Sequence, residues 1–319
     1  MIMNKYLCLL IITLFSCNNI DENKIAIVIH GGAGIILKEN ISKSKEDSII
    51  NKLDEAITRG WELLKNGESS ELAVIETIKI LEDSSLFNAG KGSVFNSNGK
   101  VENDASIMRG NDLNAGASSR TTNVKNPITL AANIMNHSEH VFLSGKGAEK
   151  FAKERNLEIV DNEYFHTEFR YNQLIDKKNE DKYGTVGCVA IDINGNIVAG
   201  TSTGGMTNKK WGRIGDSAII GSGTYANNNS CGISSTGSGE YFIRTVAAYQ
   251  VSSLLEYNNY NLNNAMSKVI HEKIGKIGGD GGMIGIDKNS NISMEFNTPG
   301  MYRAFVNKNE EKKILLYEK

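Results

Sequence analysis

Two polar turns, each between two strand-like segments, restrict the folds open to this 319-residue chain. The Asn-Gly pair at 194–195 and the polar run at 288–291 contain residues that tight turns prefer. Strands joined by so short a turn pair antiparallel. The segments expected to pair are 186–192 with 197–201, and 283–287 with 292–296. A further buried strand is expected at 25–29, ended by a glycine-rich turn at 30–34.

Helical periodicity occurs in groups between these hairpins. Apolar residues recur every three or four positions, which is the spacing of a helix with one buried face. The expected helices cover 49–64, 70–81, 127–135, 240–255 and 262–274, and the polar stretch 156–182 is expected to be a flexible linker. Hairpins combined with grouped helices predict an α+β fold, in which antiparallel sheets are covered by helices, rather than a doubly wound parallel sheet.

Charge and cysteine content exclude some classes of function. The chain has 35 basic and 37 acidic residues and no long basic run, so we expect no nucleic-acid partner. The four cysteines form no Cys-x-x-Cys pair, which argues against a zinc site. Cys188 and Cys231 are expected to be buried free thiols, with a disulfide between them as the alternative.

The first residues are typical of an export signal rather than of a folded domain. Lys5 precedes an apolar run at 6–15, which is too short to span a bilayer but has the length of a signal-peptide core. The run ends in Leu-Phe-Ser-Cys, similar to a bacterial lipoprotein signal, in which Cys17 would be lipidated and become the first mature residue. A cleaved signal without lipid is the alternative.

These observations predict three parts: a signal peptide at 1–17, a tether at 18–24 and a single domain at 25–319. The protein would be exported by a bacterium and be periplasmic or anchored as a lipoprotein. Its contact with a membrane would be through the lipid alone.

The dipeptide Gly184-Thr185 bears most directly on function. Thr185 opens the strand expected at 186–192 and follows a charged stretch without periodicity at 176–182. Cleavage of the Gly184–Thr185 bond would give Thr185 a free α-amine beside its own hydroxyl, so that nucleophile and general base would stand on one residue. Such an amine titrates at about 7.7–8.0 in model peptides and can therefore act as a base near neutral pH.

A competing serine-hydrolase interpretation comes from the segment 200–204. Its Gly-x-Ser-x-Gly pattern is that of a nucleophile elbow, and Asp216 and His271 follow Ser202 in triad order. Several glycines follow the serine where an elbow requires a helix, which favours a coincidental match. Under this interpretation Ser202→Ala would abolish activity, whereas the variant would stay active if Thr185 is the nucleophile.

Two glycine-rich segments could bind charged groups. Thr236-Gly-Ser-Gly239 stands directly before the helix expected at 240–255, where free N–H groups and the helix dipole could stabilise an oxyanion; an ordinary helix cap is the alternative. Arg213 and Asp216 lie in another glycine-rich loop. They could bind the carboxylate and the ammonium of an amino-acid-like ligand, or form a solvated ion pair.

Taken together, an ordered set of motifs resembles the plant-type asparaginase and isoaspartyl peptidase family of N-terminal nucleophile hydrolases. The motifs run in family order along nearly all of the chain beyond residue 24. They are His30-Gly-Gly-Ala-Gly34, Leu86-Phe-Asn-Ala-Gly90, Gly184-Thr-Val-Gly187, Thr201-Ser-Thr-Gly-Gly-Met-Thr-Asn208, Gly212-Arg-Ile-Gly-Asp216, Tyr225-Ala-Asn-Asn228, Thr236-Gly-Ser-Gly-Glu240 and Phe296-Asn-Thr-Pro-Gly-Met-Tyr-Arg303.

The resemblance implies a four-layer α-β-β-α sandwich and self-cleavage between Gly184 and Thr185. The products would be an α-chain, 25–184, and a β-chain, 185–319, and two such αβ units would form a dimer. Thr185 would be the nucleophile, Thr203 would orient or activate it, and Thr236 with Gly237 would form the oxyanion hole.

The resemblance also implies how ligands are held. The substrate would be bound by Arg213 on its α-carboxylate, by Asp216 on its α-amine and by a backbone contact from Gly239. Catalysis would need no cofactor. A structural sodium ion would be held by the backbone carbonyls of Leu81, Glu82, Ser84, Phe87, Ala89 and Lys91.

The implied reaction is hydrolysis of L-asparagine and of β-aspartyl dipeptides, with release of ammonia or of a peptide and then of aspartate. A glycosylasparaginase-like hydrolase of the same fold shares the nucleophile, but the Gly-Gly-Met-Thr-Asn continuation at 204–208 is more similar to the isoaspartyl branch. The alternative from another class is a lipid-anchored binding protein that keeps the fold without being processed.

Overall fold

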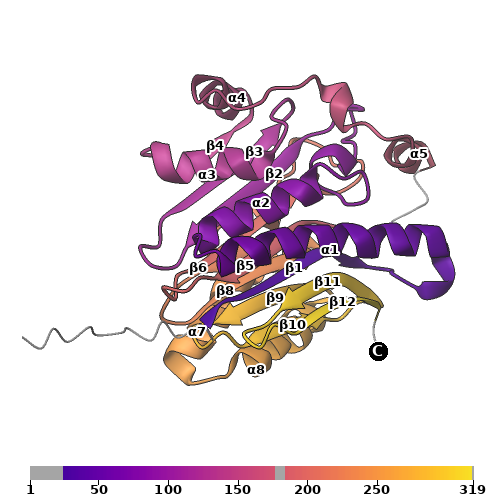
Figure 1. Cartoon of the computed structure of the whole chain (residues 1–319). Helices are drawn as coiled ribbons and strands as arrows, with labels where there is room; N and C mark the ends of the chain where they lie inside the picture. The colour runs from indigo at the N-terminus through magenta and orange to yellow at the C-terminus, as the bar shows by residue number, and fades with distance from the viewer. Residues whose placement is uncertain (1–23, 177–183, 318–319) are drawn as a thin grey trace, which may run out of the picture.

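The computed structural model describes residues 24–176 and 184–317 (Figure 1). The expected signal peptide with Cys17, the tether up to residue 23 and the charged residues 177–183 lie outside this part of the chain. No helix in the described part is both long and apolar enough to cross a membrane.

The larger of two sheets contains eight strands of the described chain. Neighbouring strands run antiparallel, except the last two, which run parallel. In order across the sheet they are β12 (Lys312–Tyr317), β11 (Gly300–Val306), β1 (Ala26–Gly34), β5 (Val186–Ile191), β6 (Ile197–Thr203), β2 (Asn103–Arg109), β3 (Ala115–Thr121) and β4 (Phe142–Ser144).

A smaller antiparallel sheet packs against the larger one. Its order is β10 (Ile292–Phe296), β9 (Gly281–Asp287), β8 (Cys231–Gly237) and β7 (Thr224–Ala226). Both predicted hairpins are confirmed, as β5–β6 and β9–β10.

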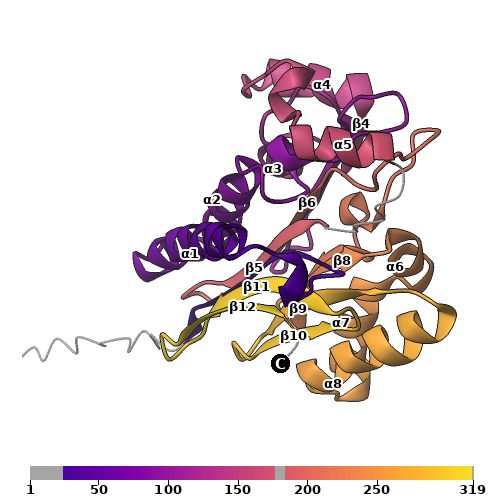
Figure 2. The ribbon, with the colours of Figure 1, turned by 90° about the vertical axis from the view of Figure 1, so that its right-hand side faces the viewer.

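Helices cover the outer face of each sheet, which gives the four layers seen edge-on in Figure 2. On the larger sheet these are α1 (Lys43–Lys65), α2 (Ser70–Glu82) and α3 (Pro127–His137), with α4 (Gly145–Glu154) beside β3 and β4. On the smaller sheet they are α6 (Gly239–Thr245), α7 (Ala247–Asn258) and α8 (Leu262–Ser267), which runs on into a π-helix at Lys268–Ile274. The predicted α-β-β-α sandwich is confirmed.

Three apolar cores separate the four layers. Ile29, Leu53 and Ile78 belong to the core between the larger sheet and its helices. Val28 and Ile284 belong to the core between the two sheets, and a third core lies between the smaller sheet and α7 and α8. Alternate residues of β1 therefore face different cores, as the period of two in a strand requires.

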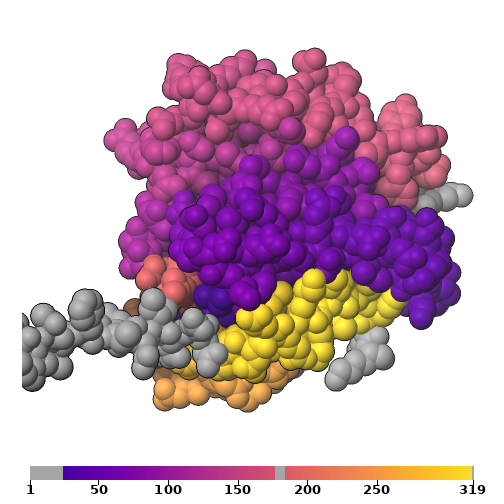
Figure 3. Space-filling view, in the orientation of Figure 1, coloured from indigo at the N-terminus to yellow at the C-terminus, as the bar shows by residue number. Residues whose placement is uncertain are grey.

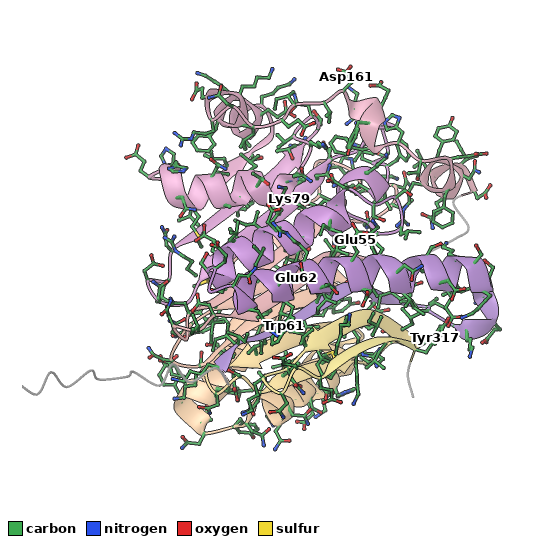
Figure 4. The ribbon with its side chains drawn as sticks, in the orientation of Figure 1. Glu55, Trp61, Glu62, Lys79, Asp161 and Tyr317 are labelled. Carbon is green, nitrogen blue, oxygen red and sulfur yellow. The ribbon has the colours of Figure 1, made fainter. Side chains whose placement is uncertain are left out.

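Local signals in the sequence explain where the first helices begin. Ser42 and Ser69 cap α1 and α2, because each side chain accepts a hydrogen bond from the amide three residues later, at 3.3 and 3.2 Å. The residues of α1 and α2 form a broad outer face beside the C-terminal strands (Figure 3). Glu55, Glu62 and Lys79 lie on this outer side (Figure 4). The residues on the opposite side of the same two helices form the buried face.

Cys188 and Cys231 are buried free thiols, as expected. Cys188 lies in the core beneath α1 and α2, and Cys231 lies in the core beneath α7 and α8. The two sheets separate them, which excludes a disulfide in this fold.

Three expectations about local structure were wrong. The strand at 25–29 does not end in a turn: β1 continues to Gly34 through a bulge between His30 and Gly32. The stretch 156–182 is not wholly a linker, since α5 (Glu168–Asp176) lies in it and buries Arg170, whose Nε donates to Gly92 O at 2.8 Å. Polar residues dominate this stretch, so the helix could not be recognised from its periodicity.

The third error concerns the single helix expected at 240–255. It is two helices, α6 and α7, separated by Val246 at φ 48° and ψ 50°. This left-handed conformation is costly for a β-branched residue. The apolar spacing continues across the break, so periodicity alone could not locate it.

The break at Val246 yields a stability prediction. Val246→Asn is expected to raise the free energy of unfolding by about 1 kcal/mol, because asparagine tolerates the left-handed region far better than valine. The midpoint of urea-induced unfolding measures the change. Val246→Thr keeps the branched Cβ and should give no such gain; equal midpoints for the Asn and Thr variants would contradict the assignment of strain.

Candidate active site

Thr185 immediately precedes β5 and lies beside the end of β6. The hairpin register pairs Val186 with Ser202, so that the next residues along, Thr185 and Thr203, come together. The Thr185 hydroxyl donates a hydrogen bond to Thr203 Oγ1 at 3.1 Å and lies 3.4 Å from Ser217 Oγ. All three side chains are buried. In the uncut chain the candidate nucleophile is therefore in contact with two other hydroxyls.

Gly184, on the other side of the expected cleavage point, packs against Gly32 and Thr236. A Cβ atom on Gly32 would lie 2.7 Å from both N and O of Gly184, and Gly32 has a φ of +110°. Both the close approach and the positive φ require glycine. A Cβ atom on Gly184 would lie 2.7 Å from Thr236 Oγ1. Gly32, the second glycine after His30, therefore lies against the peptide that is expected to be cut.

Thr236 and Gly237 end β8, and α6 begins two residues later at Gly239. Gly237 has a φ of +147°, and a Cβ atom there would lie 2.4 Å from Asp280 O. The amide of Ser238 donates to the same carbonyl at 2.9 Å, and the Ser238 hydroxyl donates to the Asp280 carboxylate. These contacts fix the turn between strand and helix.

The loop that carries Arg213 and Asp216 packs against the start of α6. Arg213 Nε and Nη2 donate to the two carboxylate oxygens of Glu240 at 2.8 and 2.7 Å. A Cβ atom on Gly239 would lie 2.7 Å from Asp216 Oδ1 and 3.0 Å from Arg213 Nη2, so both charged groups converge on this glycine. The solvated Arg213–Asp216 pair is excluded, because Asp216 is buried and Arg213 pairs with Glu240.

The electrostatics of Asp216 suit a cationic ligand. Burial raises the pKa of its carboxyl to about 7, although a backbone hydrogen bond and the charge of Arg213 act in the opposite direction. Its Oδ2 atom has no hydrogen-bond partner within the described chain. A buried carboxylate is unfavourable unless it is protonated or paired with a positive charge. An ammonium group placed here would therefore favour the ionised form.

The turn after Thr203 is held by Asn88, from a distant part of the chain, and by Lys209, from the same loop. Asn88 Nδ2 donates to Gly205 O at 2.7 Å, and Asn88 O accepts from the amide of Gly204 at 3.0 Å. Lys209 Nζ donates to Gly204 O at 2.9 Å. The Gly205 amide in turn donates to Thr203 Oγ1 at 3.0 Å. The orientation of the Thr203 hydroxyl is therefore fixed by contacts other than the one with Thr185.

The segment expected to hold sodium spans the last residues of α2 and the loop after it, which doubles back on itself. A Cβ atom on Gly90 would lie 2.4 Å from Glu82 O, and one on Gly92 would lie 2.1 Å from Phe87 O. The backbone therefore closes tightly around main-chain carbonyls, and hard cations prefer oxygen ligands of this kind. Within residues 24–176 and 184–317, no group of three or more His, Cys, Asp or Glu side chains is arranged to hold a metal.

The serine-hydrolase interpretation is wrong, because its three residues do not meet. Ser202 points to the opposite face of β6 from Thr203, and its hydroxyl donates to Glu82 Oε1 at 2.6 Å. Burial raises the pKa of Glu82 to about 8, so this carboxyl is mainly neutral at pH 7. His271 lies on the outer helical layer of the smaller sheet, 3.4 Å from Glu295 Oε2, while Asp216 converges on Gly239.

The structure thus brings the predicted residues into one region around Thr185. Thr203 contacts the Thr185 hydroxyl, Thr236 lies against Gly184, and Asp216 precedes Ser217, which touches the same hydroxyl. Sequence reasoning missed the contacts of three further residues. His30 and Asn88 lie in motifs of the resemblance, which could have indicated them, whereas no motif or spacing indicated Ser217.

Comparisons with known proteins agree with this geometry. A family model described as asparaginase matches residues 23–316. The chain belongs to the asparaginase family.

Three relatives show how far the family similarity extends. The isoaspartyl peptidase of Escherichia coli K12 is 44% identical over 88% of this chain and 92% of its own length. The plant-type L-asparaginase of Pyrococcus furiosus is 40% identical over 88% of this chain and 96% of its own. The isoaspartyl peptidase/L-asparaginase of Xenopus laevis is 37% identical over 92% of this chain and 96% of its own.

Proposed function

We propose that this chain is a self-processing amidohydrolase that cleaves β-aspartyl dipeptides and L-asparagine with Thr185 as its nucleophile. The observation that carries the proposal is the 3.1 Å contact between Thr185 Oγ1 and Thr203 Oγ1, directly after Gly184. The names of the relatives support the same substrates, since they are isoaspartyl peptidases and L-asparaginases. Those names favour neither a glycosylasparaginase nor an unprocessed binding protein.

Maturation begins with attack of Thr185 Oγ1 on the carbonyl carbon of Gly184. The C–N bond between the two residues breaks, an ester forms on the Thr185 side chain, and the nitrogen takes the hydroxyl proton. Water then hydrolyses the ester, so that Gly184 ends in a carboxylate and Thr185 has a free amine and a free hydroxyl. The β-chain from Thr185 has 319 − 184 = 135 residues, and the α-chain ends at Gly184.

In the mature enzyme the Thr185 amine acts as the base. It takes the proton from Thr185 Oγ1 as this oxygen attacks the side-chain carbonyl of the substrate, and it gives the proton to the departing amine. The acyl-enzyme is an ester of aspartate. Water attacks this ester, loses a proton to the same amine, and aspartate leaves as Thr185 Oγ1 is reprotonated. Thr203 orients the nucleophile, and Thr236 with Gly237 stabilises the oxyanion.

The charged groups beside α6 hold the α-carbon substituents of the substrate. Arg213 has five N–H donors and uses Nε and Nη2 on Glu240, which leaves donors for the substrate carboxylate. Asp216 takes the substrate ammonium, which would satisfy its unpaired Oδ2. Gly239 adds a backbone contact, because any side chain there would fill the space between the two charges.

The proposal includes two features of assembly. A sodium ion, bound by carbonyls at the end of α2 and in the loop after it, would stabilise the loop that carries Asn88 and would take no part in the reaction. Two αβ units would form a dimer, which light scattering on the matured protein tests.

Processing is the most direct test of the nucleophile. Wild-type protein should separate into two fragments under denaturing conditions, and mass spectrometry should find a fragment that begins at Thr185. Thr185→Ala should remain a single inactive chain, because it lacks the attacking hydroxyl. Ser202→Ala is the matched control and should be processed and active. Cleavage of the Thr185→Ala variant at this bond would overturn the proposal.

The raised pKa of Asp216 predicts how substrate binding depends on pH. Its carboxyl is charged above about 7 and neutral below it, so the KM for L-asparagine should rise as the pH falls through 7. Asp216→Asn should raise KM by roughly 30-fold or more, the usual effect of losing one partner of a buried ion pair, and should remove this acid dependence. Steady-state kinetics from about pH 6 to 8 measure both effects. A wild-type KM that is constant over this range would contradict the role.

We further propose that the chain is exported, that residues 1–17 form its signal and that Cys17 carries lipid before a tether at 18–24. The support is the sequence pattern alone. In a bacterial host, wild-type protein should incorporate labelled palmitate and sediment with membranes, whereas Cys17→Ala should do neither. Exported protein without label would indicate a plain cleaved signal, and protein retained inside the cell would overturn the export proposal.

A further inference from the structure

His30 is buried between the two sheets and touches the main chain of Thr185. Its Nδ1 atom lies 3.0 Å from the Thr185 carbonyl oxygen, and its Nε2 atom lies 3.0 Å from Ser234 Oγ. Burial lowers the pKa of His30 to about 3, although the bond to the Thr185 carbonyl acts in the opposite direction. The imidazole is therefore neutral at any pH at which the enzyme would work.

From Ser234 a row of buried hydroxyls continues across both sheets. Ser234 Oγ lies 2.7 Å from Thr201 Oγ1, and Thr224 Oγ1 lies 2.5 Å from the same oxygen. Ser106 Oγ lies 2.8 Å from Thr224 Oγ1 and 2.6 Å from the carbonyl oxygen of Ser217. We call His30, Ser234, Thr201, Thr224 and Ser106 the hydroxyl row. Its residues come from five strands, in the order β1, β8, β6, β7 and β2.

The protons in the hydroxyl row can be assigned from one fixed end. A carbonyl oxygen only accepts, so His30 Nδ1 must carry the proton that binds Thr185 O. The neutral ring then has a lone pair on Nε2, and the Ser234 hydroxyl must donate to it. With its proton so used, Ser234 accepts from Thr201, and Thr201 accepts from Thr224. Ser234, Thr201 and Thr224 therefore each donate toward His30, and Thr224 Oγ1 is left to accept from Ser106.

The far end of the row returns to the nucleophile. Ser106 donates to the carbonyl of Ser217 and lies in reach of Thr224. The Ser217 hydroxyl lies 3.4 Å from Thr185 Oγ1. One end of the row thus binds the carbonyl of Thr185. The other end binds the carbonyl of Ser217, whose side chain lies beside the Thr185 hydroxyl.

Gly187 leaves the space that this arrangement needs. A Cβ atom on Gly187 would lie 2.0 Å from Ser234 Oγ and 2.3 Å from His30 Nε2. No side chain fits where the His30–Ser234 bond passes over β5. The glycine two residues after Thr185 is thus explained by the hydroxyl row.

We propose that His30, held in its Nδ1–H form by the hydroxyl row, is a positioning residue that anchors the main chain of Thr185 for catalysis. The inference rests on the proposed function of Thr185. Thr185 precedes the first residue of β5, so the strand ladder does not hold it. Cleavage makes it a chain end, and chain ends fray unless they are tied down. The bond from His30 ties down the residue whose amine must act as base.

Two substitutions of His30 separate its two contacts. The amide nitrogen of asparagine is as many bonds from Cα as Nδ1 is, and the end of glutamine is as far along as Nε2. His30→Asn can therefore keep the bond to Thr185 O, and His30→Gln can keep the bond to Ser234. We expect kcat to fall about 100-fold in His30→Gln and less than about 10-fold in His30→Asn, with KM nearly unchanged in both.

Ser234 offers a variant with a matched control. Ser234→Ala removes the donor to His30 Nε2 and should lower kcat by about 10-fold at constant KM. Ser235→Ala removes the neighbouring buried hydroxyl, which lies on the other face of β8 and has no hydrogen-bond partner within the described chain. It should leave kcat unchanged. Equal losses in the two serine variants, or in the two His30 variants, would overturn the positioning role.

Nitrogen NMR of the histidine-labelled wild-type protein tests the geometry without any activity. The chain has five histidines, and the signals that disappear in His30→Asn belong to His30. They should show a proton on Nδ1 and none on Nε2 at pH 7 and still at pH 5, where an unperturbed histidine is charged. The neighbouring groups allow this: β5 presents Gly187, β8 presents Ser234, and the Arg303 guanidinium, opposite in register on β11, stacks over Phe296.

The outcomes separate this inference from the proposed function. A proton on Nε2, or a charged ring at pH 5, overturns the inference even if Thr185→Ala is inactive. An active Thr185→Ala enzyme overturns the proposed function even if the tautomer is as expected. If the His30 variants do not fold, the Ser234–Ser235 pair still decides.

Discussion

The register of the β5–β6 hairpin is the constraint on which the site depends. The turn around Asn194-Gly195 is so short that it sets the pairing of every residue along the two strands, from Ile191 with Ile197 to Val186 with Ser202. Extended by one step, the same register brings Thr185 to Thr203. A slip of one residue would turn Thr201 and Thr203 toward α2 and bring Ser202 into the space between the sheets. The turn at one end of the hairpin thus positions Thr185 and Thr203 at the other end.

Some elements could be predicted because their signals are local. The two hairpins carry turn residues between apolar strands, and the amphipathic helices carry both a period and a cap. The strands β3 and β8 could not be recognised, because Ala115–Thr121 and Cys231–Gly237 consist largely of Ala, Gly, Ser and Thr and have no apolar alternation. Their burial comes from the layers above and below them, which is information that a single segment does not contain.

The candidate site, too, could be predicted from the sequence only in part. Thr185, Arg213 and Asp216 could be named as candidates from motifs, but the residues that they contact come from other parts of the chain. Glu240 orients Arg213, and burial of Asp216 raises its pKa. No spacing in the sequence indicates that Ser217 touches Thr185 or that Ser202 binds Glu82. Contacts of this kind depend on register and on packing between layers, and both are set only when the whole sandwich is assembled.

The space between the two sheets explains how polar side chains beside Thr185 can be buried without loss of the fold. Along β1, β5 and β6 the residues that face this space are apolar at one end, as with Val28, Val189 and Ala199. At the other end they are polar, as with His30 and Thr201. A buried hydroxyl without a partner costs about 1–3 kcal/mol, so each of these groups must be paired for the sandwich to remain stable. Because the paired hydroxyls donate toward His30, His30 Nδ1 keeps its proton and is a fixed donor to the Thr185 carbonyl. The contacts that stabilise the polar end of the core are therefore the same contacts that hold the main chain of Thr185, the proposed nucleophile.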